Sequence, residues 1–245
     1  MRAQCDQLTV KYGSFTALNH VTFQVPEGQY LALLGENGAG KSTLLRALAG
    51  WFRATSGTIT INDCHWEQQE RKMRQIVKLV PDTPQFYPDL TVAEHLELVA
   101  KANRVSDWQE AAQNLLVSLG ISQQPRAYPS SFSRGMQYKL ALTMALITRP
   151  QLLLLDEPFG ALDPYSQSHL ADKIRQLAAE GQSVVLSTHV LPDNAPPHRI
   201  VILDQGHLVQ DASLEAIWNP DDDGPIGALP QRILTKVLGT VRSTP

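Results

Sequence analysis

The sequence has few cysteines and no long apolar run. Cys5 and Cys64 form neither a CxxC metal motif nor the larger even set that is typical of a disulfide framework. No apolar stretch approaches the roughly 18 residues that a membrane-spanning helix needs, and the first residues lack the apolar core of a signal peptide. We therefore expect a chain that does not cross a membrane by itself and that works in a reducing, cytosolic compartment.

An excess of positive charge is also absent. The 245 residues include 21 Lys and Arg against 24 Asp and Glu, which gives a formal net charge of −3. Such a chain lacks the cationic field that drives non-specific binding to nucleic acid, so we expect no nucleic-acid partner. Hydrophobic residues make up 43% and charged residues 18%, which is enough apolar surface for a core and excludes a disordered chain.

Short apolar segments alternate with helical ones along the chain. The pattern predicts an α/β fold with a mostly parallel sheet, preceded by antiparallel strands before residue 30. A helical pattern over about 86–150, which opens with a Thr91/Glu94 capping box, predicts an inserted helical subdomain. We expect one domain over 1–210 and a poorly patterned tail over 211–245, with a solvated loop at 221–223 before a last short helix. The core strands are expected at 30–34, 76–80, 152–155, 183–187 and 199–203.

A glycine-rich loop follows the first of these strands. Residues 35–42, Gly-Glu-Asn-Gly-Ala-Gly-Lys-Ser, match the phosphate-binding pattern GxxxxGK[ST], with a predicted strand before it and a predicted helix after it. The alternative, a glycine-rich surface turn with a chance lysine, does not account for this context. Backbone N–H groups and the helix N-terminus would bind phosphate oxygens. The candidate ATP-binding residues of this segment are Gly35, Asn37, Gly38, Ala39, Gly40, Lys41, Ser42 and Thr43.

Two carboxylates end the strand predicted at 152–155. Asp156 is placed to hold Mg²⁺ together with the hydroxyl of Ser42, and Glu157 is placed to polarise the attacking water as a general base. The alternative is an ordinary strand that ends in solvated acids. Because the phosphate loop precedes it in the same chain, the catalytic interpretation is favoured.

The segment Phe132-Ser133-Arg134-Gly135-Met136, about twenty residues before the acidic strand, and Ala161-Leu162-Asp163 after it extend the pattern. With them, the chain resembles the nucleotide-binding subunit of an ABC transporter over nearly its whole length, least after about residue 210. The resemblance implies a P-loop NTPase core and a head-to-tail dimer in which the signature segment contacts the phosphate bound by the other subunit. The family's usual LSGGQ reads FSRGM here, a form similar to that of the exporter branch. The signature residues are Ser133, Arg134, Gly135 and Met136.

The resemblance also implies roles for single residues outside these motifs. His189, in Ser-Thr-His, stands where the family has its γ-phosphate-sensing histidine, and Tyr12 where an aromatic ring stacks on adenine. Asp163 occupies the position of the loop that communicates across the dimer. Asp82 stands where most members have a glutamine that contacts Mg²⁺, with Gln85 as the nearby alternative.

The resemblance implies an ATPase that couples hydrolysis to export. It predicts ATP and Mg²⁺ as cofactors, Lys41, Glu157 and His189 as the catalytic residues, and Ser42, Asp156 and Asp82 as Mg²⁺ ligands. The expected partners are a transmembrane permease subunit and a second nucleotide-binding subunit, either a copy of this chain or a paralogue, on the cytoplasmic side of the inner membrane. The alternatives are an ABC-type ATPase without a transport role and a nucleotide-dependent regulator that does not hydrolyse ATP.

Overall fold

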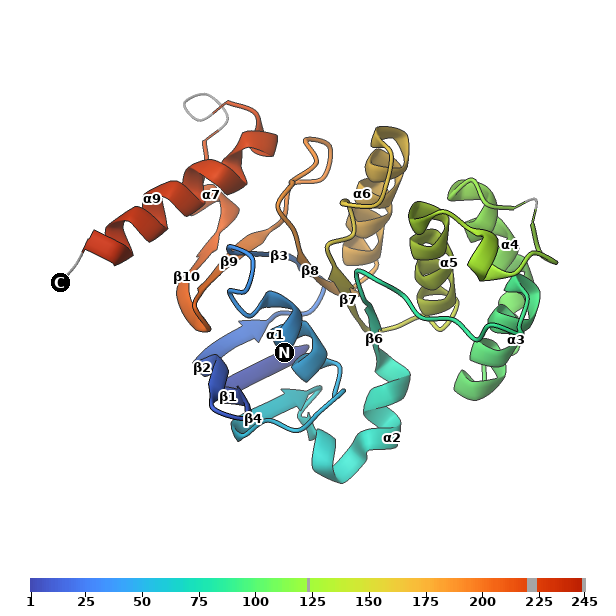
Figure 1. Cartoon of the computed structure of the whole chain (residues 1–245), viewed down its shortest axis with the longest axis horizontal. Helices are drawn as coiled ribbons and strands as arrows, with labels where there is room; N and C mark the ends of the chain where they lie inside the picture. The colour runs from blue at the N-terminus through green and yellow to red at the C-terminus, as the bar shows by residue number, and fades with distance from the viewer. Residues whose placement is uncertain (123, 220–223, 244–245) are drawn as a thin grey trace.

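The computed structural model of the protein describes residues 1–122, 124–219 and 224–243, which form two β-sheets and the helices around them (Figure 1). The acidic run 221–223, predicted as a solvated loop, lies outside the described residues. The smaller sheet has the order β2-β1-β4-β5 and is antiparallel throughout. Its strands are β1 (Ala3–Tyr12), β2 (Phe15–Val25), β4 (Ser56–Ile61) and β5 (Cys64–His65).

The larger sheet carries the site, and its order is β10-β9-β3-β8-β7-β6. All neighbouring strands in it are parallel except β10, which runs antiparallel to β9. The predicted α/β fold with a mostly parallel sheet and an N-terminal antiparallel part is therefore confirmed. The strands are β3 (Tyr30–Leu34), β6 (Val77–Val80), β7 (Leu152–Asp156), β8 (Ser183–Ser187), β9 (Arg199–Asp204) and β10 (His207–Ser213).

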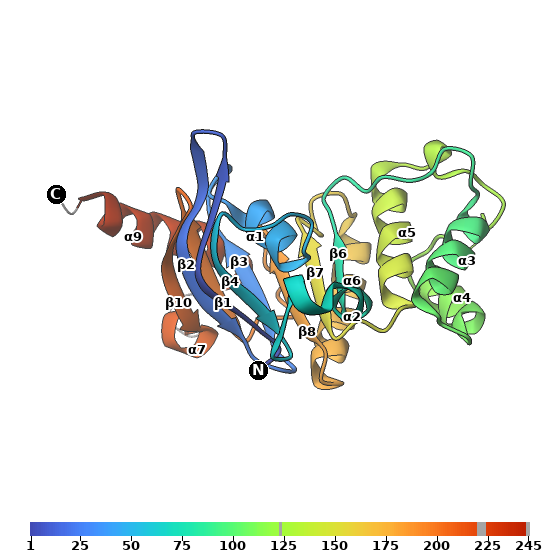
Figure 2. The same cartoon turned by 90° about the horizontal axis from the view of Figure 1, so that it is seen from below.

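Strand β3 shows why the central strands are apolar throughout. Leu31 and Leu33 pack in one core with the antiparallel sheet and α1 (Lys41–Leu48), whereas Tyr30, Ala32 and Leu34 face the opposite core. Because successive side chains of a strand point to opposite faces, a strand that is covered on both sides must be apolar at every position. Figure 2 shows α1 between the antiparallel strands and the larger sheet.

The second core contains α6 (Pro164–Ala179) and three helices that lie between β6 and β7 in the chain, α3 (Val92–Asn103), α4 (Trp108–Ser118) and α5 (Arg134–Leu146). These three helices lie together at the end of the molecule away from the antiparallel sheet (Figure 1). Thr91 caps α3 in the predicted capping box, since its hydroxyl accepts a hydrogen bond from Glu94 N and its own N–H donates to Glu94 Oε2. The inserted helices therefore follow β6 and precede β7 in the chain.

The C-terminal part is more regular than the sequence pattern indicates. The boundary expected at residue 210 falls inside β10, and Leu214, Ile226 and Leu229 are buried in the core that also holds α6. The last helix is long rather than short. The remaining helices are α2 (Trp66–Ile76), α7 (Leu214–Ile217), α9 (Leu229–Ser243) and 3₁₀ turns at Pro129–Ser131 and Ile226–Ala228.

Two features explain what the pattern missed. Strand β10 is half-buried at most of its positions, so it shows no clear alternation. Helix α2 begins without a side-chain cap and is kinked at Gln69, so it carries no start signal. Over the part of the chain that the structure describes, no helix combines the length and apolarity needed to cross a membrane.

Candidate active site

The glycine-rich loop connects the end of β3 to the start of α1, and two of its glycines are required by contacts with the backbone. A Cβ on Gly35 would lie 2.4 Å from the carbonyl oxygen of Leu203, and one on Gly40 would lie 2.7 Å from that of Ala17. Gly40 also has φ +106°, which L side chains rarely adopt. The loop therefore bends tightly after the carboxyl end of β3 and leads directly into the N-terminus of α1. A helix N-terminus in this position is what an anion-binding site requires.

Lys41, the first residue of α1, lies folded against this loop. Its side chain is only 7% exposed, and its ammonium donates hydrogen bonds to the carbonyl oxygens of Gly35, at 2.7 Å, and Glu36, at 3.2 Å. Burial lowers the pKa of Lys41, while the nearby carboxylates of Glu157 and Asp156 oppose this shift. The ammonium group thus lies at the centre of the loop, where it can bind a phosphate oxygen.

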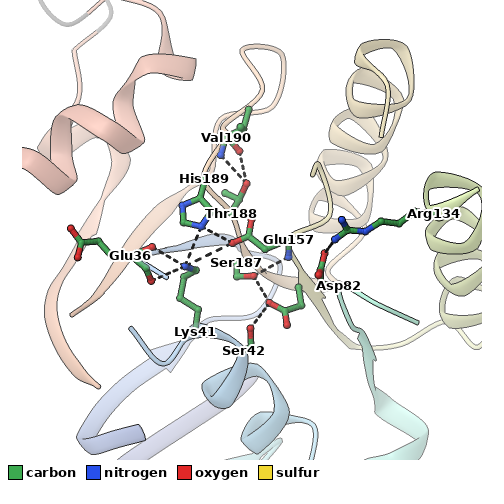
Figure 3. Close-up of polar contacts among 12 residues, drawn as sticks. Glu36, Lys41, Ser42, Asp82, Arg134, Glu157, Ser187, Thr188, His189 and Val190 are labelled. Atoms are coloured by element: carbon green, nitrogen blue, oxygen red, sulfur yellow. Dashed lines mark hydrogen bonds and ion pairs between the residues drawn. The ribbon is translucent and has the colours of Figure 1, made fainter. Parts of the chain in front are cut away.

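Three charged or polar groups from different elements converge beside the loop (Figure 3). His189 Nε2 lies 3.1 Å from Glu157 Oε1 and 3.5 Å from the Nζ atom of Lys41, and Lys41 Nζ lies 3.8 Å from Glu157 Oε1. Burial raises the pKa of Glu157, although His189 and Lys41 both act to lower it. A raised carboxyl pKa brings a general base closer to neutral pH, where proton transfer is most effective.

Ser187, at the end of β8, holds the two acids at the end of β7. Its hydroxyl donates to Asp156 Oδ1 at 2.6 Å and accepts a hydrogen bond from the backbone N–H of Glu157 at 2.9 Å. The backbone of Glu157 has φ +47°, a left-handed conformation that is uncommon for a residue with a side chain. This turn, stabilised by Ser187, places Glu157 next to His189 and leaves Asp156 facing Ser42.

Asp156 and Ser42 together have the chemistry of a magnesium site. The Ser42 hydroxyl donates to Asp156 Oδ1 at 3.0 Å, and the Asp156 side chain is almost fully buried. Within the described residues, no group of three or more His, Cys, Asp or Glu could hold a metal ion. Mg²⁺ commonly uses one or two carboxylates, waters and substrate phosphates rather than an all-protein cage, so this hydroxyl and carboxylate fit the ion.

Asp82 and Gln85 lie on the wall of an open pocket of about 750 Å³ that also includes Ser42 and Asp156. The hydrogen bonds and ion pair of Asp82 within the described residues go to Thr83 and Arg134 instead of Ser42 or Asp156. Its carboxylate pairs with the guanidinium of Arg134 at 2.6 Å (Figure 3).

The signature residues occupy the start of α5. Ser133 caps the helix by accepting a hydrogen bond from the N–H of Met136. A Cβ on Gly135 would lie 2.7 Å from the carbonyl oxygen of Ala161, so only glycine permits this close approach. Within the described part of the chain, these residues contact α5, Asp82 and Ala161 rather than the phosphate loop of the same chain.

Two further predicted residues are placed at the edges of the site. Tyr12 is half-exposed at the tip of the β1–β2 hairpin and meets Phe52 edge to face, with ring centroids 5.9 Å apart. Asp163 caps α6 by accepting hydrogen bonds from the N–H and hydroxyl of Ser166. These hydrogen bonds lower the pKa of Asp163.

Sequence reasoning missed the role of Ser187 and the partnership of Asp82 with Arg134. The only sequence signal for Ser187 is its place directly before Thr188 and His189, at the end of an apolar strand. The partnership has no sequence signal, because the two residues are 52 positions apart and pair only once α5 packs beside β6.

Comparison of the sequence with known proteins identifies the family to which the chain is similar. The profile described as "ABC transporter" matches residues 18–160. The bacitracin transport ATP-binding protein of Enterococcus faecalis is 30% identical over 216 residues, covering 87% of this chain and 70% of that protein. The aliphatic sulfonates import ATP-binding protein of Pectobacterium atrosepticum is 32% identical over 242 residues, covering 97% of this chain and 88% of that protein.

A solved structure extends the likeness to three dimensions. It is described as the dimeric, post-hydrolysis state of an ATP-binding cassette with bound ADP and Pi, and it is 25% identical to this chain with a TM-score of 0.78. The alignment covers 86% of this chain and 98% of that one.

Proposed function

This chain belongs to the ABC transporter family and is an ATP-binding, ATP-hydrolysing transport subunit, and we propose that it powers export through a separate transmembrane subunit. Cassettes of this family form dimers and work with transmembrane subunits. We propose that two such cassettes, copies of this chain or a pair with a paralogue, close head to tail over two ATP molecules. The signature form FSRGM and the Asp82 variant support export, and the protein would then be peripheral on the cytoplasmic side of the inner membrane.

The convergence of Lys41, Glu157 and His189 is the observation that carries the catalytic part of the proposal. Lys41 would bind the β- and γ-phosphates, Glu157 would take the proton of the attacking water, and His189 would hold Glu157 in place and contact the γ-phosphate. Ser133 and Gly135 of the partner subunit would contact the same phosphate. Apart from the proton transfer to Glu157, each of these steps is positioning and charge stabilisation, which dominate phosphoryl transfer.

Ser42 and Asp156, with Asp82 as a third candidate, would hold Mg²⁺. When bound, the ion neutralises negative charge that develops on the phosphoryl oxygens. Two further residues position the metal ligands and the base. Ser187 orients Asp156 toward Ser42, and the ring of Tyr12 would stack on the adenine.

Phosphate release by purified protein tests the hydrolytic part. We expect Glu157→Gln to bind ATP but to release phosphate at least about a hundredfold more slowly, since general-base catalysis contributes about 10²–10⁴-fold. Glu110→Gln, an exposed carboxylate on α4, serves as the matched control and should keep the wild-type rate. Unchanged turnover in Glu157→Gln would remove Glu157 from its proposed role.

Purification of the tagged protein from gently solubilised membranes tests the transport part. Mass spectrometry should identify a stoichiometric polytopic membrane protein in the complex. Recovery with ribosomes or soluble proteins alone would instead favour an ABC-type ATPase without a transport role.

A further inference from the structure

Two positions at which this chain departs from its family pattern, Asp82 and Arg134, are joined to each other. Arg134 Nη2 lies 2.6 Å from Asp82 Oδ1, and the hydroxyl of Thr83 lies 3.4 Å from Asp82 Oδ2. Both carboxylate oxygens of Asp82 therefore have a partner outside the metal site. The ion pair connects the segment after β6 with the first residue of α5, the helix that carries the signature residues.

Asp82 also borders the pocket in which Mg²⁺ would lie. The wall of that pocket includes Ser42 and Asp156, the two residues whose oxygens fit the ion. The carboxylates of Asp82, Asp156 and Glu157 all act on the buried hydroxyl of Tyr138, whose pKa is raised first by burial and then by these charges. The three carboxylates of Asp82, Asp156 and Glu157 therefore lie close enough to act on one buried group.

We infer that Arg134 competes with the nucleotide-bound metal for the carboxylate of Asp82. While the ion pair is formed, Asp82 is held toward α5, and its release from Arg134 frees a third oxygen ligand for Mg²⁺. Arg134 is thus a positioning residue that couples the start of the signature helix to the metal site. The inference rests on the proposed function, because it takes the Mg²⁺–ATP site as given.

The exposure of the pair decides how strong this competition is. The side chains of Arg134 and Asp82 are 58% and 38% exposed, respectively. Ion pairs this accessible to water shift an equilibrium by about fivefold at most, and salt screens them. The pair therefore biases the position of Asp82 without locking it, which allows binding of nucleotide and metal to open it.

Binding of Mn²⁺ tests the inference without relying on turnover. The probe is Mn²⁺ titrated into the full-length protein with a saturating non-hydrolysable ATP analogue, and free Mn²⁺ is followed by electron paramagnetic resonance. We expect Arg134→Gln to tighten Mn²⁺ binding about two- to fivefold, and this gain in affinity to shrink at high salt.

Two companion variants show whether the effect acts through Asp82. Arg134→Lys keeps the positive charge, so its Mn²⁺ affinity should stay near that of wild type. Asp82→Asn should weaken binding, and adding Arg134→Gln to it should have no further effect.

Arg74→Gln is the matched control, because Arg74 borders the same pocket as Asp82, pairs with Glu70 and is about as exposed as Arg134. It removes the same charge without touching Asp82, so it should leave Mn²⁺ affinity nearly unchanged. The inference is overturned if Arg134→Gln fails to tighten binding, if Arg74→Gln tightens it equally, or if the gain persists in the Asp82→Asn background. Absence of any Mn²⁺ binding by wild type with the analogue would overturn the proposed metal site as well.

Discussion

The carboxylate of Glu157 lies 3.1 Å from Nε2 of His189, although the two residues leave the sheet from different strands. Two features bring them together: β7 and β8 are parallel neighbours, and the chain turns at Glu157 through a left-handed conformation. Such backbone conformations cost about 1–3 kcal/mol and persist where the surrounding structure holds them. Ser187 supplies that support through its hydrogen bond to the Glu157 N–H.

Replacement of Glu157 changes stability as well as activity. Because burial raises the pKa of Glu157 in the folded protein, folding binds a proton that the unfolded chain releases. Stability therefore falls as pH rises from the ordinary glutamate value through the raised one. We expect Glu157→Gln to be more stable than wild type toward urea at pH 7, and this advantage to disappear below about pH 4.3. An advantage that is equally large at pH 4 and pH 7 would contradict the raised pKa.

Removal of the Lys41 ammonium weakens nucleotide binding. A hydrogen bond to a charged group contributes about 1.5–3 kcal/mol, so Lys41→Ala should lower ATP affinity by about ten- to a hundredfold in equilibrium titration. Lys173→Ala, which removes a half-buried lysine from α6, provides the comparison and should bind ATP normally. Equal ATP affinity in the two variants would show that Lys41 does not contact the nucleotide.

Addition of a single methyl group to Gly135 destabilises the protein. Alanine favours helices over glycine, yet here its Cβ would meet the carbonyl oxygen of Ala161 at 2.7 Å. We expect Gly135→Ala to lose about 1–3 kcal/mol of unfolding free energy, measured by urea denaturation. Gly239→Ala in α9 meets nothing within 4 Å and should be neutral or stabilising. A gain in stability for both variants would mean that α5 moves away from Ala161 at little cost.

Removal of the Tyr12 ring weakens the binding of adenine nucleotides. Stacking of a base on an aromatic side chain contributes about 1–3 kcal/mol, so Tyr12→Ala should reduce ATP affinity about five- to a hundredfold, whereas Tyr12→Phe keeps it. Phe15→Ala removes an exposed ring from the same hairpin and should leave affinity unchanged. If Tyr12→Phe weakens binding as much as Tyr12→Ala, the hydroxyl rather than the ring face is the contact.

Most of the fold could be predicted because its signals are local. The strand 30–34 was placed to the residue, since five consecutive apolar positions between turn residues have few other interpretations. Asp163 followed by Pro164 is a start signal for α6, and Thr91 with Glu94 is one for α3. Both signals come from hydrogen bonds within one turn of helix, so they can be read without the rest of the chain.

The parts that escaped prediction depend on distant partners. Strand β1 shows no simple alternation of buried and exposed residues, because its register with β2 shifts around Leu8 and Gln7 has positive φ. In the candidate site, the phosphate loop and both acids were identified from short motifs. The contacts of Ser187 and the pairing of Asp82 with Arg134 exist only after the sheet and α5 assemble.

The position of β3 in the larger sheet has a consequence for synthesis of the chain on the ribosome. Both neighbours of β3, β8 and β9, come from residues 183–204, so the phosphate loop emerges long before any strand that borders it. The nascent chain then carries a five-residue apolar strand with two unpaired edges, a segment that invites aggregation. Slow translation of the middle part of the mRNA would therefore lower the yield of folded protein, although the amino-acid sequence is unchanged.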